Sequence, residues 1–457
     1  MPAAIGVLLV LLAAACPGGG QPGPSPTASS TPTTSSPPSG VEPIFLDVVA
    51  PMSKGIGTQV SDESTYLNGM QLAVEDVNAA GGVGGRPIVL TYRDDRDDAD
   101  EATRIIGDIL SQGSTAILYV GAGTALIPLQ TQFAQAGTPV VLLEGDLYTG
   151  QDMFRQVFQT TIPWVWQANV IARYVVTDRK AKDIVFIGTG PEAPGAATAL
   201  GAALSYWGGH LTESFDDTSR DPTTGMSAAL DRAASADWAV AFGPPVDVLG
   251  LVNGIEEAEF GDRQAGITSS ASLLVSDPRL AQPDPGRTAC YTYTWAGWAE
   301  PIPRVGRFLE RFEAMFGNSP VGLEQEGYDA VRILVDSLKA TEGAGGRRLT
   351  AALESILDRT HASFPVDLGP DDHVFLPRDQ LGLFAVAGPK ERLDPWQIVG
   401  SQPWRPVMRT FTYDGERDNI LDRDRRVFFP FWRKNQPGPE YWLSRYGIVT
   451  GPEDSLH

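Results

Sequence analysis

The chain has 457 residues, which is too many for one ordinary hydrophobic core and typical of two or three domains. Its formal net charge of -21 argues against a nucleic-acid partner, because phosphate backbones bind basic surfaces. Two cysteines and four scattered histidines exclude a disulfide scaffold and a multi-cysteine zinc site, so we expect neither a metal nor any other cofactor.

The first forty residues are typical of an export signal followed by a tether. Residues 5–15 form an apolar run that is too short to span a bilayer and fits the core of a signal peptide. The run ends in LAAAC, which resembles the lipobox of bacterial lipoproteins and implies a signal peptide over residues 1–16 with lipidation of Cys16. Cleavage after Ala15 at an A-x-A site, without lipidation, is the alternative. Residues 17–40 are nearly all Pro, Gly, Ser and Thr, which predicts a tether between a membrane anchor and a folded body.

Beyond residue 40, the hydrophobic pattern alternates between strand and helix in two series. The first series has expected strands at 44–49, 88–92, 116–120 and 139–143, with helices through 67–77, through 102–109 and up to 134. The second has expected helices at 164–176 and up to 204, and strands at 183–187 and 238–242. Such alternation predicts an α/β fold of two doubly wound lobes, each a parallel sheet covered on both faces, with a boundary near 155–165.

A glycine-rich stretch, AAGGVGGRPIVL at residues 79–90, has the composition of a phosphate-binding loop but the opposite surroundings. A phosphate loop follows a strand and opens a helix, whose free N–H groups bind the anion. This stretch instead follows a helix and leads into a strand. We therefore predict a turn in which Gly81 takes the left-handed conformation that ends a helix.

Ligands in open α/β sheets bind beyond the carboxyl ends of the strands, so the loops there carry the candidate site. After the third strand, residues 121–124 (GAGT) open a helix, with Pro128 near its start. The N–H groups of this turn and the Thr124 hydroxyl suit an anion such as a carboxylate, and a simple helix cap at Thr124 is the alternative. After the fourth strand, Asp146 suits an ammonium group and Tyr148 an apolar side chain.

The remaining loops give no enzyme site. The stretch GTGPEAPG at 188–195 matches a dinucleotide fingerprint only loosely, because its third glycine is displaced and two prolines intervene. The acidic run DDRDD at 94–98 lies between a strand and a helix, and we interpret it as a helix start and solvated charge in preference to a metal site. The sequence contains no P-loop, nucleophile elbow or H-E-x-x-H motif, so we predict that the protein is not an enzyme.

Four stretches carry a family resemblance: APMSKG at 50–55, NGMQLAVEDVNAAGGVGGRPIVLTYRDD at 68–95, AGTPVV at 136–141 and GYDAVRILVDSL at 327–338. They resemble the branched-chain amino-acid-binding proteins, which are type 1 periplasmic substrate-binding proteins of ABC transporters. The resemblance implies two lobes joined by a hinge of three chain crossings, with the ligand cleft between them. It assigns residues 41–160 and 291–375 to lobe 1, and residues 161–290 and 376–415 to lobe 2. Residues 416–457 remain as an aromatic extension that packs on lobe 2 or contacts a partner.

The same resemblance implies a ligand site. Gly123, Thr124 and Ala125 match the position at which the family holds a ligand carboxylate, and Gly145, Asp146 and Leu147 match a second contact after the fourth strand. The other predicted site residues are Ser53, Tyr148, Glu192, Pro245 and Ser270. Where the family often has an aromatic residue and an acid, this chain has Glu192 and the pair Ser269 and Ser270. The ammonium contact therefore falls to Asp146 or Glu192, or the ligand is not an α-amino acid.

The function implied is that of an exported, lipid-anchored, monomeric solute-binding protein on the outer face of the cytoplasmic membrane. Such a protein would capture a small polar ligand, an amino acid or a related carboxylate or amide, and deliver it to an ABC permease. A ligand-sensing domain for a membrane signalling partner is the alternative. An exported α/β enzyme is disfavoured, because the sequence lacks catalytic motifs.

Overall fold

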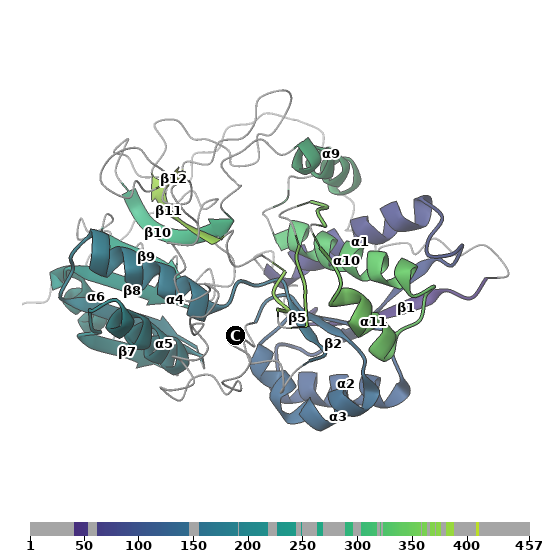
Figure 1. The fold of residues 1–457 in the computed structure, drawn as a ribbon, viewed down its shortest axis with the longest axis horizontal. Coiled ribbons are helices and arrows are strands. Elements are labelled where there is room, and N and C mark those ends of the chain that lie inside the picture. Colours follow the sequence, from purple (N-terminus) through teal and green to yellow (C-terminus); the bar gives the residue numbers. More distant parts are fainter. Residues whose placement is uncertain are drawn as a thin grey trace, which may run out of the picture. The chain divides into compact units, whose positions relative to one another are not determined.

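The computed structural model describes residues 41–53, 62–145, 155–190, 192–217, 226–243, 248, 263–267, 288–295, 303–317, 320, 323–357, 359–362, 366–370, 372–375, 381–387 and 408–410. The segment 1–40, which holds Cys16, and the extension 416–457 lie outside these residues. The described elements form two sheets, each with its own helices (Figure 1).

The first sheet is entirely parallel and has the strand order β2–β1–β3–β4–β5. Its strands are β1 (Ile44–Ala50), β2 (Ile88–Asp94), β3 (Ile117–Tyr119), β4 (Val140–Leu142) and β5 (Val157–Gln159). The four strands expected from the hydrophobic pattern are confirmed, and β5 is an additional strand. The register pairs Tyr119 with Leu142 and Leu142 with Gln159, so β3, β4 and β5 end at one edge of the sheet.

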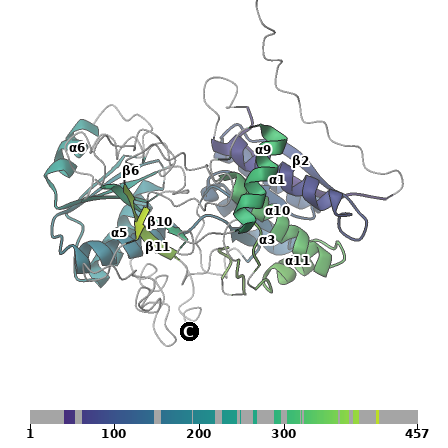
Figure 2. The ribbon, with the colours of Figure 1, turned by 90° about the horizontal axis from the view of Figure 1, so that it is seen from above.

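Helices from two distant parts of the chain cover this sheet. One face packs against α1 (Asp62–Ala79), α10 (Leu323–Ala340) and α11 (Gly346–Leu353). The other face packs against α2 (Ala99–Gln112), the 3-10 helix η1 (Gly123–Leu129) and α3 (Gln130–Ala136). Figure 2 shows α9 (Pro303–Phe316) beside α1 and α10, where Phe308 and Phe312 pack with Leu72. The helices expected through 67–77, through 102–109 and at 327–338 are confirmed.

Two glycines let α1 and α10 touch backbone to backbone. A Cβ atom on Gly69 would overlap the carbonyl group of Glu324, and one on Gly327 would overlap that of Tyr66. This close approach buries α10 along much of its length. At the other end of α1, the chain turns into β2 through Gly81, whose φ of 94° confirms the predicted left-handed helix end.

The second sheet has the strand order β12–β11–β10–β9–β8–β6–β7. Its strands are β6 (Ile184–Thr189), β7 (Glu213–Asp217), β8 (Trp238–Phe242), β9 (Gln264–Ile267), β10 (Thr288–Trp295), β11 (Leu381–Ala387) and β12 (Met408–Thr410). The strands from β7 to β10 are parallel, but β11 is antiparallel to both β10 and β12, so the prediction of a wholly parallel sheet is wrong at this edge. The cause is the chain path. No crossover helix on this sheet connects β10 to β11 among the described elements, so the rule that keeps crossover-linked strands parallel does not apply.

Helices α4 (Trp164–Arg173), α5 (Ala193–Tyr206) and α6 (Met226–Ser235) belong to the second sheet. The core there includes Trp166, Phe186 and Trp238, all nearly inaccessible to solvent. Helix α4 continues as a π-helix, η2 (Tyr174–Asp178), which the sequence pattern does not predict. The expected strands at 183–187 and 238–242, and the helices at 164–176 and up to 204, are confirmed.

Along the described elements, the chain passes from one sheet to the other three times. It leaves β5 for α4, returns between β10 and α9, and leaves again after Phe375 for β11. The first and third passages start side by side, because Gln159 N donates to His373 O at 2.9 Å and Phe375 N donates to Gln159 O at 2.9 Å. The sequence grouped residues 291–375 with lobe 1, but β10 stays in the second sheet up to Trp295, so the second passage begins after that residue.

Candidate functional site

Loops from neighbouring strands are joined at the carboxyl edge of the first sheet. The N–H of Met52, after β1, donates to Asp94 Oδ1, at the end of β2, at 3.0 Å. Gly145 N, after β4, donates to Gly121 O, after β3, at 3.0 Å. This is the edge at which open α/β sheets bind ligands.

The turn after β3 contains three of the predicted site residues. Gly123, Thr124 and Ala125 open η1, where Gly123 and Ala125 are buried and Thr124 is exposed. The helix is capped by Ala122 without a side-chain hydrogen bond, so the alternative that Thr124 caps it is wrong. The first N–H groups of a helix have no intrahelical acceptor. The amides of Gly123 and Thr124, with the Thr124 hydroxyl, can therefore serve an anion.

The loop after β4 packs directly on this turn. Gly145 is buried, and a Cβ atom at this position would lie 2.5 Å from Gly121 O and would overlap Gly123 N. Residue 145 therefore has to be glycine for the two loops to approach this closely. Three predicted ligand contacts come next in the chain and lie outside the described residues: Asp146, Leu147 and Tyr148.

A buried tyrosine supports the turn after β3. Tyr119 is 1% exposed, and its hydroxyl donates to Ala122 O at 3.2 Å. Burial raises the pKa of Tyr119, and the negative charges of Asp95 and Glu144 raise it further. The phenol therefore stays neutral and remains a hydrogen-bond donor.

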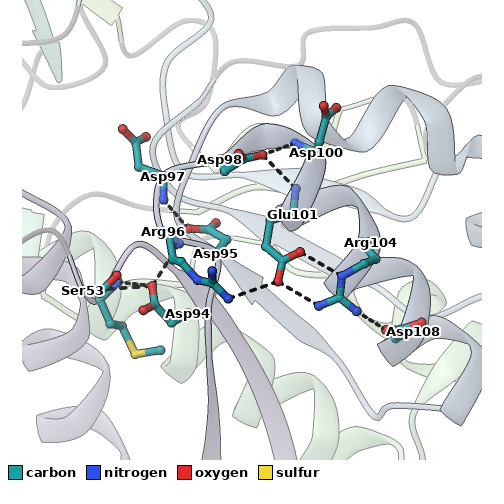
Figure 3. Close-up of polar contacts among 11 residues, drawn as sticks. Ser53, Asp94, Asp95, Arg96, Asp97, Asp98, Asp100, Glu101, Arg104 and Asp108 are labelled. Carbon is teal, nitrogen blue, oxygen red and sulfur yellow. Dashed lines mark hydrogen bonds and ion pairs between the residues drawn. The ribbon is translucent and has the colours of Figure 1, made fainter.

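The acidic run after β2 is a folded loop held by its own carboxylates (Figure 3). Asp94 Oδ1 accepts hydrogen bonds from the N–H groups of Ser53 at 3.4 Å and of Arg96 at 3.0 Å. Asp98 accepts from two amides in the first turn of α2, which confirms the predicted helix start. Asp95 is 2% exposed, and burial raises its pKa to about 6. Within the described part of the chain, no group of three or more His, Cys, Asp or Glu side chains can hold a metal ion.

The loop after β5 brings in an acid that the sequence did not single out. Thr160 Oγ1 lies 3.3 Å from Leu143 O and 3.2 Å from Glu326 Oε2, and Thr161 Oγ1 donates to Leu143 O at 2.9 Å. Desolvation of the Glu326 carboxyl group raises its pKa to about 8. An acid in the first turn of a helix ordinarily indicates a favourable charge near the helix N-terminus, so no sequence pattern points to this contact.

Comparison with known proteins identifies the family. The family of periplasmic binding proteins matches residues 44–379 of the chain. The chain belongs to the periplasmic binding protein family. The expected type 1 periplasmic binding protein of the branched-chain amino-acid class is confirmed, as is its α/β fold. Members of the family are substrate-binding proteins and not enzymes, and membership implies an exported protein.

Three proteins show what this periplasmic binding protein is similar to. The Leu/Ile/Val-binding protein homolog 3 of Brucella melitensis is 27% identical over 204 residues, which are 44% of this chain and 53% of that protein. A branched-chain amino acid transporter substrate binding protein of Streptococcus pneumoniae, solved with isoleucine, has a TM-score of 0.61 at 17% identity, over 75% of this chain and 95% of that one. A solute binding protein of R. palustris, solved with benzoate, has a TM-score of 0.58 at 19% identity, over 76% and 94%. The chain spans about half the length of the curated relatives it matches.

The predicted site residues of this periplasmic binding protein fall into three groups. Five of them lie at the carboxyl edge of the first sheet: Ser53, Gly123, Thr124, Ala125 and Gly145. Glu192 lies before α5, on the second sheet. Pro245 and Ser270, like residues 146–148, lie outside the described residues. No helix in the described part of the chain is both long enough and apolar enough to cross a membrane.

Proposed function

We propose that this periplasmic binding protein captures a small polar solute, an amino acid or a related carboxylate or amide, and delivers it to an ABC permease. The observation that carries the proposal is the contact between Gly145 and Gly123, which joins the loops after β3 and β4 into one unit. The amides of Gly123 and Thr124 and the Thr124 hydroxyl suit a carboxylate. Isoleucine and benzoate, with which two proteins of the same fold were solved, share a carboxylate group.

We assign the ammonium group of an amino-acid ligand to Asp146 or Glu192. In support, both acids follow the carboxyl end of a strand, Asp146 after β4 and Glu192 after β6. The remaining proposed contacts are Ser53, Ala125, Leu147, Tyr148, Pro245 and Ser270. A ligand without an ammonium group, such as an amide or an aromatic acid, would leave these two acids without a ligand partner and would bind through the carboxylate turn or the uncharged contacts.

The chain path supports a clamp mechanism with a hinge at the three passages between the sheets. Lobe 1 comprises residues 41–160 and the part of 296–375 that packs on the first sheet, and lobe 2 comprises 161–295 and 376–415. A ligand that contacts both lobes favours the closed arrangement, because a ligand shifts an equilibrium toward the state that it binds more tightly. The permease would then recognise the closed, monomeric protein.

Cys16 and the tether over 17–40 support a lipid anchor on the outer face of the cytoplasmic membrane. A Cys16→Ser variant expressed in a bacterial host should leave the membrane fraction, whereas the unaltered chain should stay in it. Equal partitioning of the two proteins would contradict the anchor and favour ordinary cleavage after Ala15.

A thermal-shift screen of the full chain tests the solute assignment. The panel contains L-amino acids, aromatic acids, amides and short peptides, with the methyl ester of each responding acid as its matched control. A native-state ligand raises Tm with rising concentration, and we expect the ester to lose this effect because it has no carboxylate. If no compound of the panel raises Tm, the proposed ligand class is contradicted. If an ester raises Tm as much as its acid, the proposal that the turn after β3 binds a carboxylate is contradicted.

A further inference from the structure

A chain of three hydrogen-bonding groups connects α10 to the loop after β4. Thr160 Oγ1 lies 3.2 Å from Glu326 Oε2 and 3.3 Å from Leu143 O. A hydroxyl has one hydrogen to donate, and both of these neighbours are acceptors when Glu326 is ionised. While Glu326 is ionised, Thr160 donates to its carboxylate, and Leu143 O keeps only the hydrogen bond from Thr161 Oγ1. Thr160 can donate to Leu143 O only when Glu326 carries a proton and donates it to Thr160.

The position of Leu143 links this chain of groups to the proposed ligand site. Leu143 comes two residues before Gly145, and its N–H donates to Tyr119 O at 2.8 Å. Its carbonyl also accepts a hydrogen bond from Thr161 Oγ1 at 2.9 Å. Gly145 packs against Gly123, in the turn after β3 that we assign to the ligand carboxylate. A shift of Leu143 therefore displaces both this turn and the loop after β4.

The surroundings of Glu326 disfavour its charge. Desolvation raises the pKa of Glu326 most, and the negative charge of Asp329, on the same helix, raises it further. The hydrogen bond from Thr160 lowers this pKa, but by less than desolvation raises it. Among the described residues, no cation lies within ion-pair distance of Glu326. Charged groups on the elements around α10 are engaged with other partners: Asp76 with Tyr328 and Arg311, His361 with Asp336, Arg347 with Ala134 O, and Glu354 with Arg155 and His373.

We propose that Glu326 is a positioning residue for ligand capture, which as the neutral acid lets Thr160 bind the Leu143 carbonyl and tighten the loop after β4, and on ionisation withdraws this hydrogen bond. The inference rests on the proposed function, because this loop contributes Gly145 to the solute site. Burial raises the pKa of Glu326 to about 8, so the neutral form prevails at neutral pH. Ligand affinity is therefore constant up to about pH 8 and falls above it, by up to about tenfold per pH unit.

The test measures Kd for L-isoleucine from about pH 6 to about pH 10, in the full chain and in Glu326→Gln. The unaltered chain should lose affinity above about pH 8. Glu326→Gln should bind as well at neutral pH and show no alkaline loss, because the glutamine amide donates to Thr160 at every pH. A second variant, Asp329→Asn, should shift the onset of the loss to lower pH, because it removes the charge that opposes ionisation. An alkaline loss in Glu326→Gln equal to that of the unaltered chain would overturn the proposal.

Hydrogen exchange in the ligand-free chain separates this inference from the proposed function. At about pH 9.5, residues 143–145 should exchange several-fold faster than at about pH 7 after correction for the intrinsic rate, and Glu326→Gln should abolish the difference. If no ligand of the panel binds but hydrogen exchange depends on Glu326 in this way, the proposed solute class is wrong. The proposal that Glu326 positions the loop after β4 is then still supported. If a ligand binds and neither readout depends on Glu326, the positioning role fails and the solute assignment stands.

Discussion

The backbone of Gly145 lies against the backbone of Gly123, with no room for a side chain between them. A Cβ atom on Gly145 would overlap Gly123 N and would lie 2.5 Å from Gly121 O and 2.9 Å from the carbonyl carbon of Ala122. Gly145 N also donates to Gly121 O at 3.0 Å. The turn after β3 and the start of the loop after β4 are therefore packed together and joined by a hydrogen bond.

Gly145→Ala should lower ligand affinity at least about tenfold and destabilise the fold by about 1–3 kcal/mol, because the added methyl group pushes the two loops apart. Isothermal titration and Tm measure the two effects. Gly201→Ala is the matched control. The nearest neighbour of a Cβ atom on Gly201, in α5, is 4.0 Å away, so this variant should gain about 0.5–1 kcal/mol of stability and bind normally. Normal binding by Gly145→Ala would exclude the paired loops from the site.

Thr124→Val should weaken binding of a carboxylate ligand about tenfold without unfolding the protein, because it replaces a hydroxyl donor by a methyl group of similar size. Thr124 is exposed, so we expect its stability to change by less than about 0.5 kcal/mol. Thr198→Val, on the exposed face of α5, is the control and should change neither quantity. An unchanged affinity in Thr124→Val would remove this hydroxyl from the ligand contacts.

The hydrophobic pattern of the sequence predicts those strands and helices whose own apolar residues recur at a regular spacing. The strand Ile44–Ala50 and the helix Ala99–Gln112 are examples, because their apolar residues recur at the spacing of a strand or a helix. The pattern misses β5, because Val157–Gln159 is only three residues long and is followed by polar residues. It also misses the 3-10 geometry of η1, which contains Pro128, a residue that has no N–H for an α-helical hydrogen bond.

In the candidate site, too, some residues could be predicted from local sequence and others depend on tertiary contacts. Gly123 and Gly145 could be placed from sequence, because each follows a recognisable strand. Glu326 could not, because its partner Thr160 is 166 residues away in the chain and the contact depends on how α10 packs. The antiparallel strand β11 was missed for a similar reason, since its direction depends on where the chain returns from the first sheet.

Asp95→Asn should stabilise the protein at pH 7 by about 1–2 kcal/mol. Burial raises the pKa of Asp95 to about 6, so the folded state holds this proton more tightly than the unfolded state. The stability that Asp95 contributes is thus present at low pH and is lost as the pH rises toward 6. Asparagine has no charge to bury and keeps the oxygen that accepts from Asp97 N at 3.1 Å.

Urea denaturation at about pH 4 and about pH 7 measures this gain, which should be confined to the higher pH. Asp98→Asn is the control, since asparagine and aspartate cap helices about equally well and Asp98 is exposed. The same gain at both pH values would show that the effect of Asp95→Asn does not come from ionisation.

Glu354→Gln should destabilise the protein at pH 7 by about 2 kcal/mol. Glu354 pairs with His373, whose Nε2 lies 3.5 Å from Oε1, and with Arg155, whose Nε lies 3.0 Å from the same atom. The contact with His373 and then the hydrogen bond from Arg155 lower the pKa of Glu354 to about 2. The stability that this carboxylate contributes is therefore present above the ordinary pKa of 4.5 and is lost as the pH falls toward 2.

The difference in stability between the unaltered chain and Glu354→Gln should shrink to about half near pH 3. Urea denaturation at several pH values measures it, with the exposed Glu313→Gln as a control that should stay near zero throughout. Because His373 accepts the N–H of Gln159 on its carbonyl, the same variant should also speed hydrogen exchange where the first and third passages pair. A loss of stability that is equal at about pH 3 and about pH 7 would assign the effect to packing and not to the charge of Glu354.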